Sequence, residues 1–170
     1  MRSIRAILIL MLAAVAACTP APAPAPEAAT AGVELITLQR TQCFGTCPAY
    51  RVSVARGGVV RFQSFNQGDS TAATARIDAA SFEALVREAE RIGFHSLPGL
   101  IERDPEICGP WATDHPSATV TIHGSAGTKS VSDYHGCHGK SERLAALRRF
   151  EDRIDSVAGS ARWVRPGRFP

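Results

Sequence analysis

A tract of alternating proline and alanine divides the chain and limits where a folded domain can begin. Prolines stand at every second position from Pro20 to Pro26. Proline fixes its φ angle and has no amide donor, so this tract can form neither helix nor sheet. Residues 18–32 are therefore expected to form a semi-rigid spacer of about 3.1 Å per residue, with a reach of roughly 40 Å. The folding unit must follow it, and residues 33–158 are expected to form a single globular domain.

The segment before the spacer has the three parts of a secretory signal peptide. Arg2 and Arg5 form the positive part, an uncharged apolar run follows, and small residues then precede Cys18. The apolar run is much shorter than the ~20 residues that a transmembrane helix needs. Residues 1–17 are therefore expected to be a signal peptide that is removed on export.

The last residues of this segment, Val15-Ala16-Ala17-Cys18, resemble the lipobox of bacterial lipoproteins. The resemblance implies that Cys18 receives a thioether-linked lipid, that the chain is cleaved before it, and that the new amino group is acylated. Several acyl chains together anchor a protein stably to a membrane. Thr19, rather than Asp, follows the cysteine, which resembles the pattern for delivery to the outer membrane. The expected location is therefore the periplasmic face of that membrane.

Removal of the signal peptide also removes most of the net charge. The 19 basic residues include Arg2 and Arg5, so 17 basic and 16 acidic residues remain and the net charge falls to about +1. A chain with this balance lacks the basic footprint of a nucleic-acid-binding protein, and no nucleic-acid partner is expected. Basic residues gather only in the C-terminal tail, residues 159–170, which is expected to be solvated or to touch an anionic envelope surface.

The order of strands and helices in the domain favours an α+β fold. Alternation of apolar and polar residues predicts strands, and apolar residues at helical spacing predict helices. The predicted elements are strands at 34–39, 49–55, 59–65, 118–123 and 128–134 and helices at 79–92 and 141–157. Because every predicted strand connection is short, we expect an antiparallel sheet built from two hairpins with two helices packed on one face.

Two glycines and an aspartate mark the ends of predicted elements. Gly58, after Gly57, is suited to the turn of the first hairpin. Asp78 can cap the N-terminus of the first helix, and Gly93 stands where a left-handed residue would end it. The following segment, 94–114, is rich in proline and glycine and is expected to be irregular.

Four cysteines remain once Cys18 carries lipid. An even number of cysteines in an oxidising compartment predicts two disulfides, for which three connectivities are possible. We favour Cys108–Cys137, which would tie the irregular segment to the end of the second hairpin, together with Cys43–Cys47.

A metal site is the alternative for the same residues. The spacing of Cys43 and Cys47 lies within the range that zinc sites use, and His135 and His138 stand beside Cys137. Such ligands would also suit copper. Thiol redox chemistry is a weaker alternative, because three residues rather than two separate the cysteines, and the cysteines join strands instead of opening a helix. The favoured disulfide hypothesis requires no cofactor.

The segment Cys43-Phe44-Gly45-Thr46-Cys47-Pro48-Ala49-Tyr50 resembles the opening of an uncharacterised bacterial domain family, found in many exported and lipid-anchored proteins. Thr113-Asp114 and the closing helix are also similar, and the likeness covers most of residues 33–157. The resemblance implies a fold and an envelope location, and it implies no reaction.

The chain offers no catalytic constellation that we recognise. Ser125 lacks the strand–Ser–helix context of a nucleophile elbow, and the glycine-rich turns lack the lysine of a phosphate loop. We therefore favour a non-enzymatic binding or structural domain, held on the membrane through Cys18, with an unknown envelope protein or ligand as its partner. Phe44, in the loop between the first two strands, either packs on the core or contacts that partner.

Overall fold

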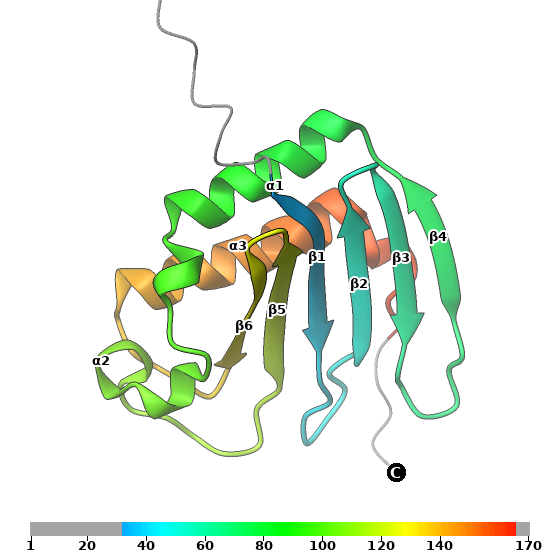
Figure 1. The fold of residues 1–170 in the computed structure, drawn as a ribbon. Coiled ribbons are helices and arrows are strands. Elements are labelled where there is room, and N and C mark those ends of the chain that lie inside the picture. The colour runs from blue at the N-terminus through cyan, green and yellow to red at the C-terminus, as the bar shows by residue number, and fades with distance from the viewer. Residues whose placement is uncertain (1–31, 166–170) are drawn as a thin grey trace, which may run out of the picture.

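Six strands form one antiparallel sheet in the order β4-β3-β2-β1-β5-β6 (Figure 1). The computed structural model describes residues 32–165, so the signal peptide, Cys18, most of the spacer and the end of the tail lie outside the described residues. The strands are β1 (Val33–Arg40), β2 (Tyr50–Ala55), β3 (Val59–Ser64), β4 (Ala72–Arg76), β5 (Ser117–Gly124) and β6 (Gly127–Tyr134). The α-helices are α1 (Ala79–Arg91), α2 (Pro105–Cys108) and α3 (Glu142–Ala158).

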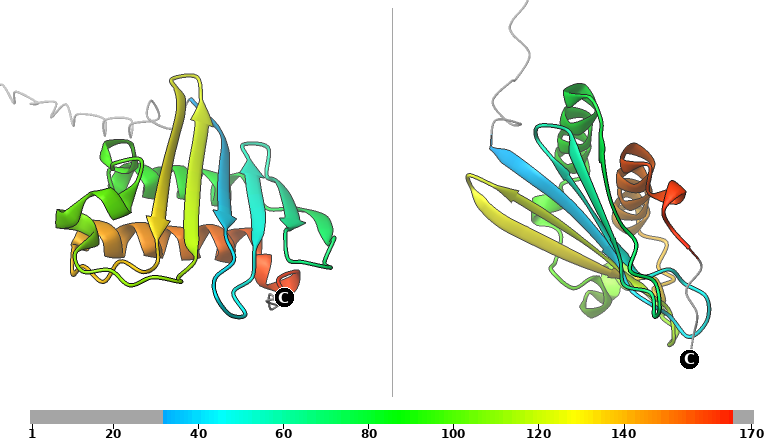
Figure 2. Two further views of the ribbon diagram at one scale, coloured as in Figure 1. Left: turned by 90° about the horizontal axis from the view of Figure 1, so that it is seen from below. Right: turned by 90° about the vertical axis from the view of Figure 1, so that its right-hand side faces the viewer.

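The two long helices, α1 and α3, lie on the same side of the sheet, and the other face of the sheet carries no helix (Figure 2). This arrangement confirms the predicted α+β class with helices on one face. The two predicted hairpins are also present, as β2–β3 and β5–β6. β1 joins them, because it pairs with β2 on one side and with β5 on the other. No helix among the described residues is long and apolar enough to cross a membrane.

The core lies between the sheet and the two long helices. Alternation along each strand sends every second side chain towards the helices. In β2, Val52 and Val54 are fully buried, whereas Arg51 between Tyr50 and Val52 is exposed. Large buried apolar side chains from the helical elements include Phe82, Leu85, Phe94, Leu144, Leu147, Phe150 and Ile154.

The predicted helix ends are confirmed at α1. An Asp78 carboxylate oxygen accepts a hydrogen bond of 2.7 Å from the backbone amide of Ser81. Gly93 follows the helix with φ of 67°, a left-handed conformation that glycine adopts without steric cost. The charge-assisted cap and the left-handed residue fix both the start and the end of this helix.

Two parts of the fold were not predicted. β4 forms one edge of the sheet from Ala-Ala-Thr-Ala-Arg, a segment without large apolar side chains. The segment 94–114, expected to be irregular, contains α2 and the 3₁₀ turns η1 (Phe94–Ser96) and η2 (Ile101–Arg103). It covers the other edge, where the amide of Ser132 donates to the carbonyl of Gly99 at 2.9 Å. Covering an edge strand in this way blocks pairing with another chain.

The chain after α3 differs from the expected solvated tail. A 3₁₀ turn, η3 (Ser160–Arg162), follows the helix, and Trp163 then packs against Phe62 with ring centroids 5.4 Å apart. The side-chain amide of Asn66 also donates to the carbonyl of Arg165 at 3.0 Å. Residues 160–165 therefore belong to the folded domain.

Candidate functional site

The helix-free face of the sheet is covered by hydrogen-bonding side chains. Strand pairing places them in two rows that cross the sheet: Ala72, Gln63, Arg51, Gln39, Thr119 and Ser132, and beside it Thr74, Arg61, Ser53, Thr37, Thr121 and Ser130. Eleven of these twelve positions are Arg, Gln, Ser or Thr. This surface, called the open face below, is therefore polar from β4 to β6, with no apolar stripe through its centre.

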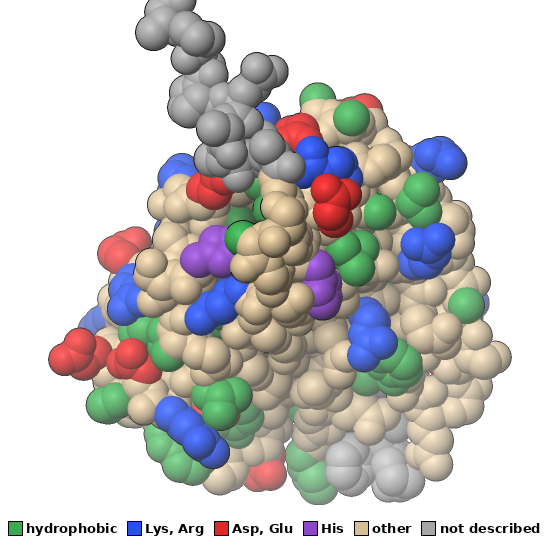
Figure 3. Space-filling view, viewed as in Figure 1, with side chains coloured by type: hydrophobic (Ala, Val, Ile, Leu, Met, Phe, Trp, Pro, Cys, Tyr) green, Lys and Arg blue, Asp and Glu red, His purple; other side chains and the backbone are tan. Residues whose placement is uncertain are grey.

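Basic residues stand on the open face, and its two central rows contain no acidic residue. Arg51 and Arg61 lie in the two central rows, and Arg76 and His123 share their side of the sheet. Figure 3 shows the face, with blue arginine side chains among the tan polar ones over β2 to β4. Two shallow hollows of about 460 and 380 Å³ lie on it, and Arg51 and Ser53 line both.

Cross-strand hydrogen bonds hold part of this surface in place. Arg51 donates to Gln39 Oε1 at 2.6 Å, and its guanidinium lies 5.3 Å from the ring centroid of Phe65. The hydroxyls of Thr121 and Ser130 lie 3.0 Å apart. Such contacts order the side chains and leave hydroxyl and guanidinium groups available to a ligand.

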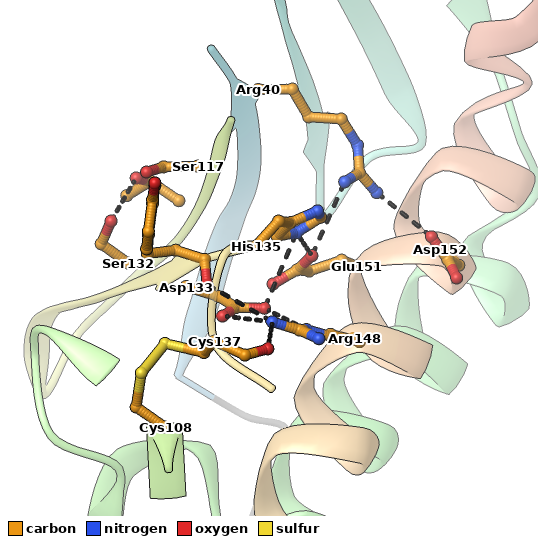
Figure 4. A network of polar contacts seen from close by, with 12 residues as sticks. Arg40, Cys108, Ser117, Ser132, Asp133, His135, Cys137, Arg148, Glu151 and Asp152 are labelled. Carbon is orange, nitrogen blue, oxygen red and sulfur yellow. Dashed lines mark hydrogen bonds and ion pairs between the residues drawn. A yellow bond between two sulfur atoms is a disulfide. The ribbon is translucent and has the colours of Figure 1, made fainter. Parts of the chain in front are cut away.

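A second polar region is buried at the other side of the sheet, between β6 and α3 (Figure 4). α3 directs an apolar stripe into the core, and next to it a polar stripe recurs every three or four residues. This stripe consists of Arg148, Glu151, Asp152 and Asp155. The sheet contributes Arg40 and Asp133, and His135 follows the end of β6. We call Arg40, Asp133, His135, Arg148, Glu151 and Asp155 the ionic cluster.

Asp133 is a member of the ionic cluster whose two carboxylate oxygens both accept hydrogen bonds. It is fully buried, and Arg148 donates to both of its carboxylate oxygens, at 2.8 and 3.3 Å. Arg148 also donates to the carbonyl of Cys137 at 3.1 Å. The fork of the guanidinium thus fixes both the carboxylate and the chain that leads away from β6.

His135 lies between two carboxylates. Its Nε2 atom is 3.0 Å from Glu151 Oε2 and 3.6 Å from Asp133 Oδ2. The imidazole side chain is 28% exposed, so it forms the solvent-facing side of the cluster. Asp133, His135 and Glu151 each offer one ligand atom, and these three atoms lie within 4.8 Å of one another.

Glu151 is almost completely enclosed, with a side chain 1% exposed. Burial raises the pKa of its carboxyl above the ordinary value, and the charge of Asp133 acts in the same direction, while His135 and Arg40 oppose the shift. Its Oε1 atom is buried and accepts no hydrogen bond from the described residues. A buried carboxylate oxygen without a partner is costly, and a proton or a cation at this position would stabilise it.

The far end of the cluster joins the sheet to the C-terminal part of α3. Arg40 donates through Nε to Asp155 Oδ2 at 2.9 Å, and its Nη1 atom lies 3.6 Å from Glu151 Oε2. The hydroxyl of Tyr50 donates to the same Asp155 oxygen at 2.8 Å. Burial opposes the charge on Arg40, but Asp155, Tyr50 and Glu151 together outweigh burial, and the pKa of the guanidinium is raised.

The structure pairs the four cysteines of the domain. Cys43 and Cys47 lie at disulfide distance in the loop between β1 and β2, and Cys108 and Cys137 join α2 to the segment after β6. A metal or thiol-redox site built on these sulfur atoms would first require their reduction.

The two histidines beside Cys137 lie apart from each other in their contacts. His135 turns towards Asp133 and Glu151, whereas His138 is exposed and its ring lies 5.9 Å from that of His115.

Phe44 does not enter the core. Its side chain is 76% exposed at the loop between β1 and β2, which rules out the alternative of a core residue. Gly45 in the same loop has φ of 147°, a conformation that glycine adopts without steric cost.

Sequence reasoning found only His135 among the residues of the ionic cluster. For Asp133 and Glu151, the sequence signal was a charged residue at a strand or helix position that faces the core. Asp133 follows the alternation of Val131 to the buried side of β6, and Glu151 adjoins Phe150 on α3. A charge at such a position requires a partner, which indicates a buried polar site.

One comparison with known proteins identifies the domain. Residues 34–158, which run from the second residue of β1 to the end of α3, match a family described as a domain of unknown function (DUF6438). No curated protein matches the chain significantly. The matched residues cover well over half of the chain and include both the open face and the ionic cluster, and the chain therefore belongs to the DUF6438 family, an uncharacterised domain family.

Proposed function

We propose that this chain is a lipid-anchored protein of the bacterial cell envelope whose domain binds an acidic polysaccharide on the open face of its sheet. The lipobox-like segment ending at Cys18 supports the anchor, and the paired cysteines are in keeping with an oxidising compartment. The proline-rich spacer would hold the domain away from the membrane surface.

The composition of the open face carries this proposal. Eleven of the twelve positions in its two central rows are Arg, Gln, Ser or Thr, and none is acidic. Hydroxyl and amide groups hydrogen-bond sugar hydroxyls, and a guanidinium fork binds a carboxylate in two places. A polymer that carries both hydroxyl and carboxylate groups complements this surface.

The same surface is less suited to other partners. Protein interfaces are usually centred on aromatic or aliphatic anchors, and the two central rows contain neither. A nucleic-acid interface would require a stronger excess of basic residues than a net charge of about +1 provides. The polar, moderately basic face therefore favours an acidic polysaccharide.

Affinity electrophoresis of the mature chain tests this proposal. Migration through gels that contain polygalacturonate should be retarded, and neutral dextran should have little effect. Replacing both Arg51 and Arg61 with alanine should weaken the retention at least tenfold, because both guanidinium groups stand in the central rows. Arg87→Ala is the control, since Arg87 is exposed on α1, on the other side of the sheet. Equal retention of all three proteins would refute the open face as the binding surface.

Fatty-acid labelling tests the anchor separately. A clickable fatty acid should be incorporated into the wild-type chain and not into Cys18→Ser. Incorporation that is unchanged in the variant would contradict lipidation at Cys18, while leaving the binding experiment unaffected.

A further inference from the structure

We propose that Asp133, His135 and Glu151 form a binding site for one divalent transition-metal ion, with Zn²⁺ as the best-fitting probe. This site differs from the metal set that the sequence indicated, because it uses no cysteine. It is also independent of the open face, since the ionic cluster lies on the helix side of the sheet.

The spacing of the ligand atoms fits one ion. Zn²⁺ binds imidazole nitrogen and carboxylate oxygen at about 2.0–2.2 Å, and tetrahedral ligands at that distance lie roughly 3.3–3.5 Å apart. His135 Nε2 lies 3.0 Å from Glu151 Oε2 and 3.6 Å from Asp133 Oδ2, on either side of that value. The three ligand atoms all lie within 4.8 Å of one another, so the two carboxylates would need to close around an ion from positions that already surround it.

The charge balance of the ionic cluster favours a cation. Asp133, Glu151 and Asp155 carry three negative charges when ionised, and Arg40 and Arg148 supply two positive charges. The buried Glu151 Oε1 atom accepts no hydrogen bond from the described residues and extends towards Asp133 in Figure 4. A bound ion would neutralise the excess negative charge, and it would satisfy this oxygen if Glu151 bound through both of its carboxylate oxygens.

Neighbouring arginines lie beside two of the ligands. Arg148 fixes the carboxylate of Asp133 through two hydrogen bonds, while Arg40 approaches Glu151 only to 3.6 Å. Such outer contacts orient ligands and raise metal affinity. His135 would bind as a neutral imidazole through Nε2, and its partial exposure leaves an open side at which water can complete the coordination.

The donor set indicates the class of ion. One imidazole nitrogen and two carboxylate oxygens suit borderline ions such as Zn²⁺ and Mn²⁺. Ca²⁺ and Mg²⁺ prefer an all-oxygen shell with more ligands, so they should not compete at equal concentration.

Calorimetric titration of the mature chain, oxidised and freed of metal by a chelator, tests the site. Zn²⁺ should bind with one ion per chain and raise the melting temperature. His135→Ala should lower the affinity at least tenfold and abolish the shift, because it removes the only nitrogen ligand. His138→Ala is the matched control, three residues away and exposed, and should bind as the wild type does.

Glu151→Gln provides a second variant, which keeps the shape of the side chain and removes a charged ligand. It should lose affinity for Zn²⁺ as His135→Ala does. If Glu151→Gln fails to fold, the His135→Ala variant still tests the site, because His135 is partly exposed and its substitution disturbs the core less. The absence of saturable Zn²⁺ and Mn²⁺ binding would overturn the proposal. Wild-type affinity in His135→Ala would also overturn it, since the ion would then be bound elsewhere.

Discussion

The hydroxyl of Tyr50 in β2 donates a hydrogen bond of 2.8 Å to Asp155 Oδ2 in α3, 105 positions later in the chain. Arg40 of β1 donates to the same oxygen at 2.9 Å. One carboxylate thereby ties two neighbouring strands to the helix that covers them. Since hydrogen bonds to charged acceptors contribute more than neutral ones, this junction should contribute measurably to stability.

The first prediction concerns Tyr50 and alkaline pH. Burial, followed by the charge of Asp155, raises the pKa of Tyr50 above its ordinary value of 10.0. The pKa is higher in the folded than in the unfolded state, so this stabilisation is fully present below about pH 10 and is lost as pH rises through the folded value. Tyr50→Phe should lower the unfolding free energy by about 1.5–3 kcal/mol at neutral pH. It should also reduce the alkaline loss of stability.

Urea unfolding at neutral pH and at about pH 11 measures both effects. Tyr134→Phe is the control, because the hydroxyl of Tyr134 accepts a hydrogen bond from the amide of His115 and has no carboxylate partner among the described contacts. The account of Tyr50 fails if its variant and the control lose the same stability at alkaline pH.

The second prediction concerns the two disulfides, which close loops of very different length. Cys108 and Cys137 are 29 positions apart, whereas Cys43 and Cys47 are four apart. Loop-closure entropy gives about 3.6 kcal/mol for the longer loop and about 1.9 kcal/mol for the shorter one. Replacing Cys108 and Cys137 with alanine should therefore cost more stability than replacing Cys43 and Cys47.

Chemical denaturation of the two double variants under oxidising conditions gives the comparison. Cys108 and Cys137 are also buried, which adds a packing loss to the same variant. A smaller loss for this pair than for Cys43 and Cys47 would contradict the loop-length argument.

The sequence predicted the elements whose local patterns were strong. Alternation of Tyr50, Val52 and Val54 with polar residues identified β2, and Asp78 and Gly93 identified the ends of α1. β4 was missed because its alanines and threonine carry little hydrophobic signal, and pairing with β3 supplies its strand geometry. Trp163 was missed because only the fold brings it to Phe62.

The ionic cluster could not be assembled from sequence spacing. Arg40 ends β1, Asp133 lies near the end of β6, and Glu151 is in the middle of α3. These residues meet only because β1 lies in the centre of the sheet beside β5, while α3 crosses behind both hairpins (Figure 1). Long-range topology, which local patterns do not encode, determines the site.

The third prediction concerns the turn between β2 and β3. Gly58 has φ of 76°, and a Cβ atom there would lie 2.2 Å from the carbonyl oxygen of Ile77. Its own carbonyl accepts a hydrogen bond from the amide of Ile77, which fixes this close approach. Gly58→Ala should therefore lower the unfolding free energy by roughly 2–4 kcal/mol, from backbone strain and steric overlap together.

Gly57→Ala is the control in the same turn. A Cβ atom at Gly57 meets no other atom within 4 Å, and the residue is exposed. Its substitution should change stability by no more than about 0.5 kcal/mol. Thermal and urea unfolding of the two variants compare them directly, and equal losses would show that the close contact with Ile77 is unimportant.

The fourth prediction concerns Phe44. Its ring is 76% exposed beside the Cys43–Cys47 pair, so Phe44→Ala should change the unfolding free energy by about 0.5 kcal/mol or less. Phe82→Ala, at a fully buried position on α1, should cost about 3–5 kcal/mol. Urea unfolding of both variants provides this comparison.

An exposed aromatic ring on a closed loop is also suited to anchor a partner, since aromatic side chains dominate many interfaces. If Phe44 contacts an envelope protein, Phe44→Ala should reduce the recovery of that protein from membranes in mild detergent, while the melting temperature stays constant. Phe65→Ala is the control, because Phe65 is a half-exposed ring that lies beneath Arg51. Equal recovery with both variants would exclude Phe44 as a specific contact, and a large loss of stability in Phe44→Ala would mean that its ring is needed for folding.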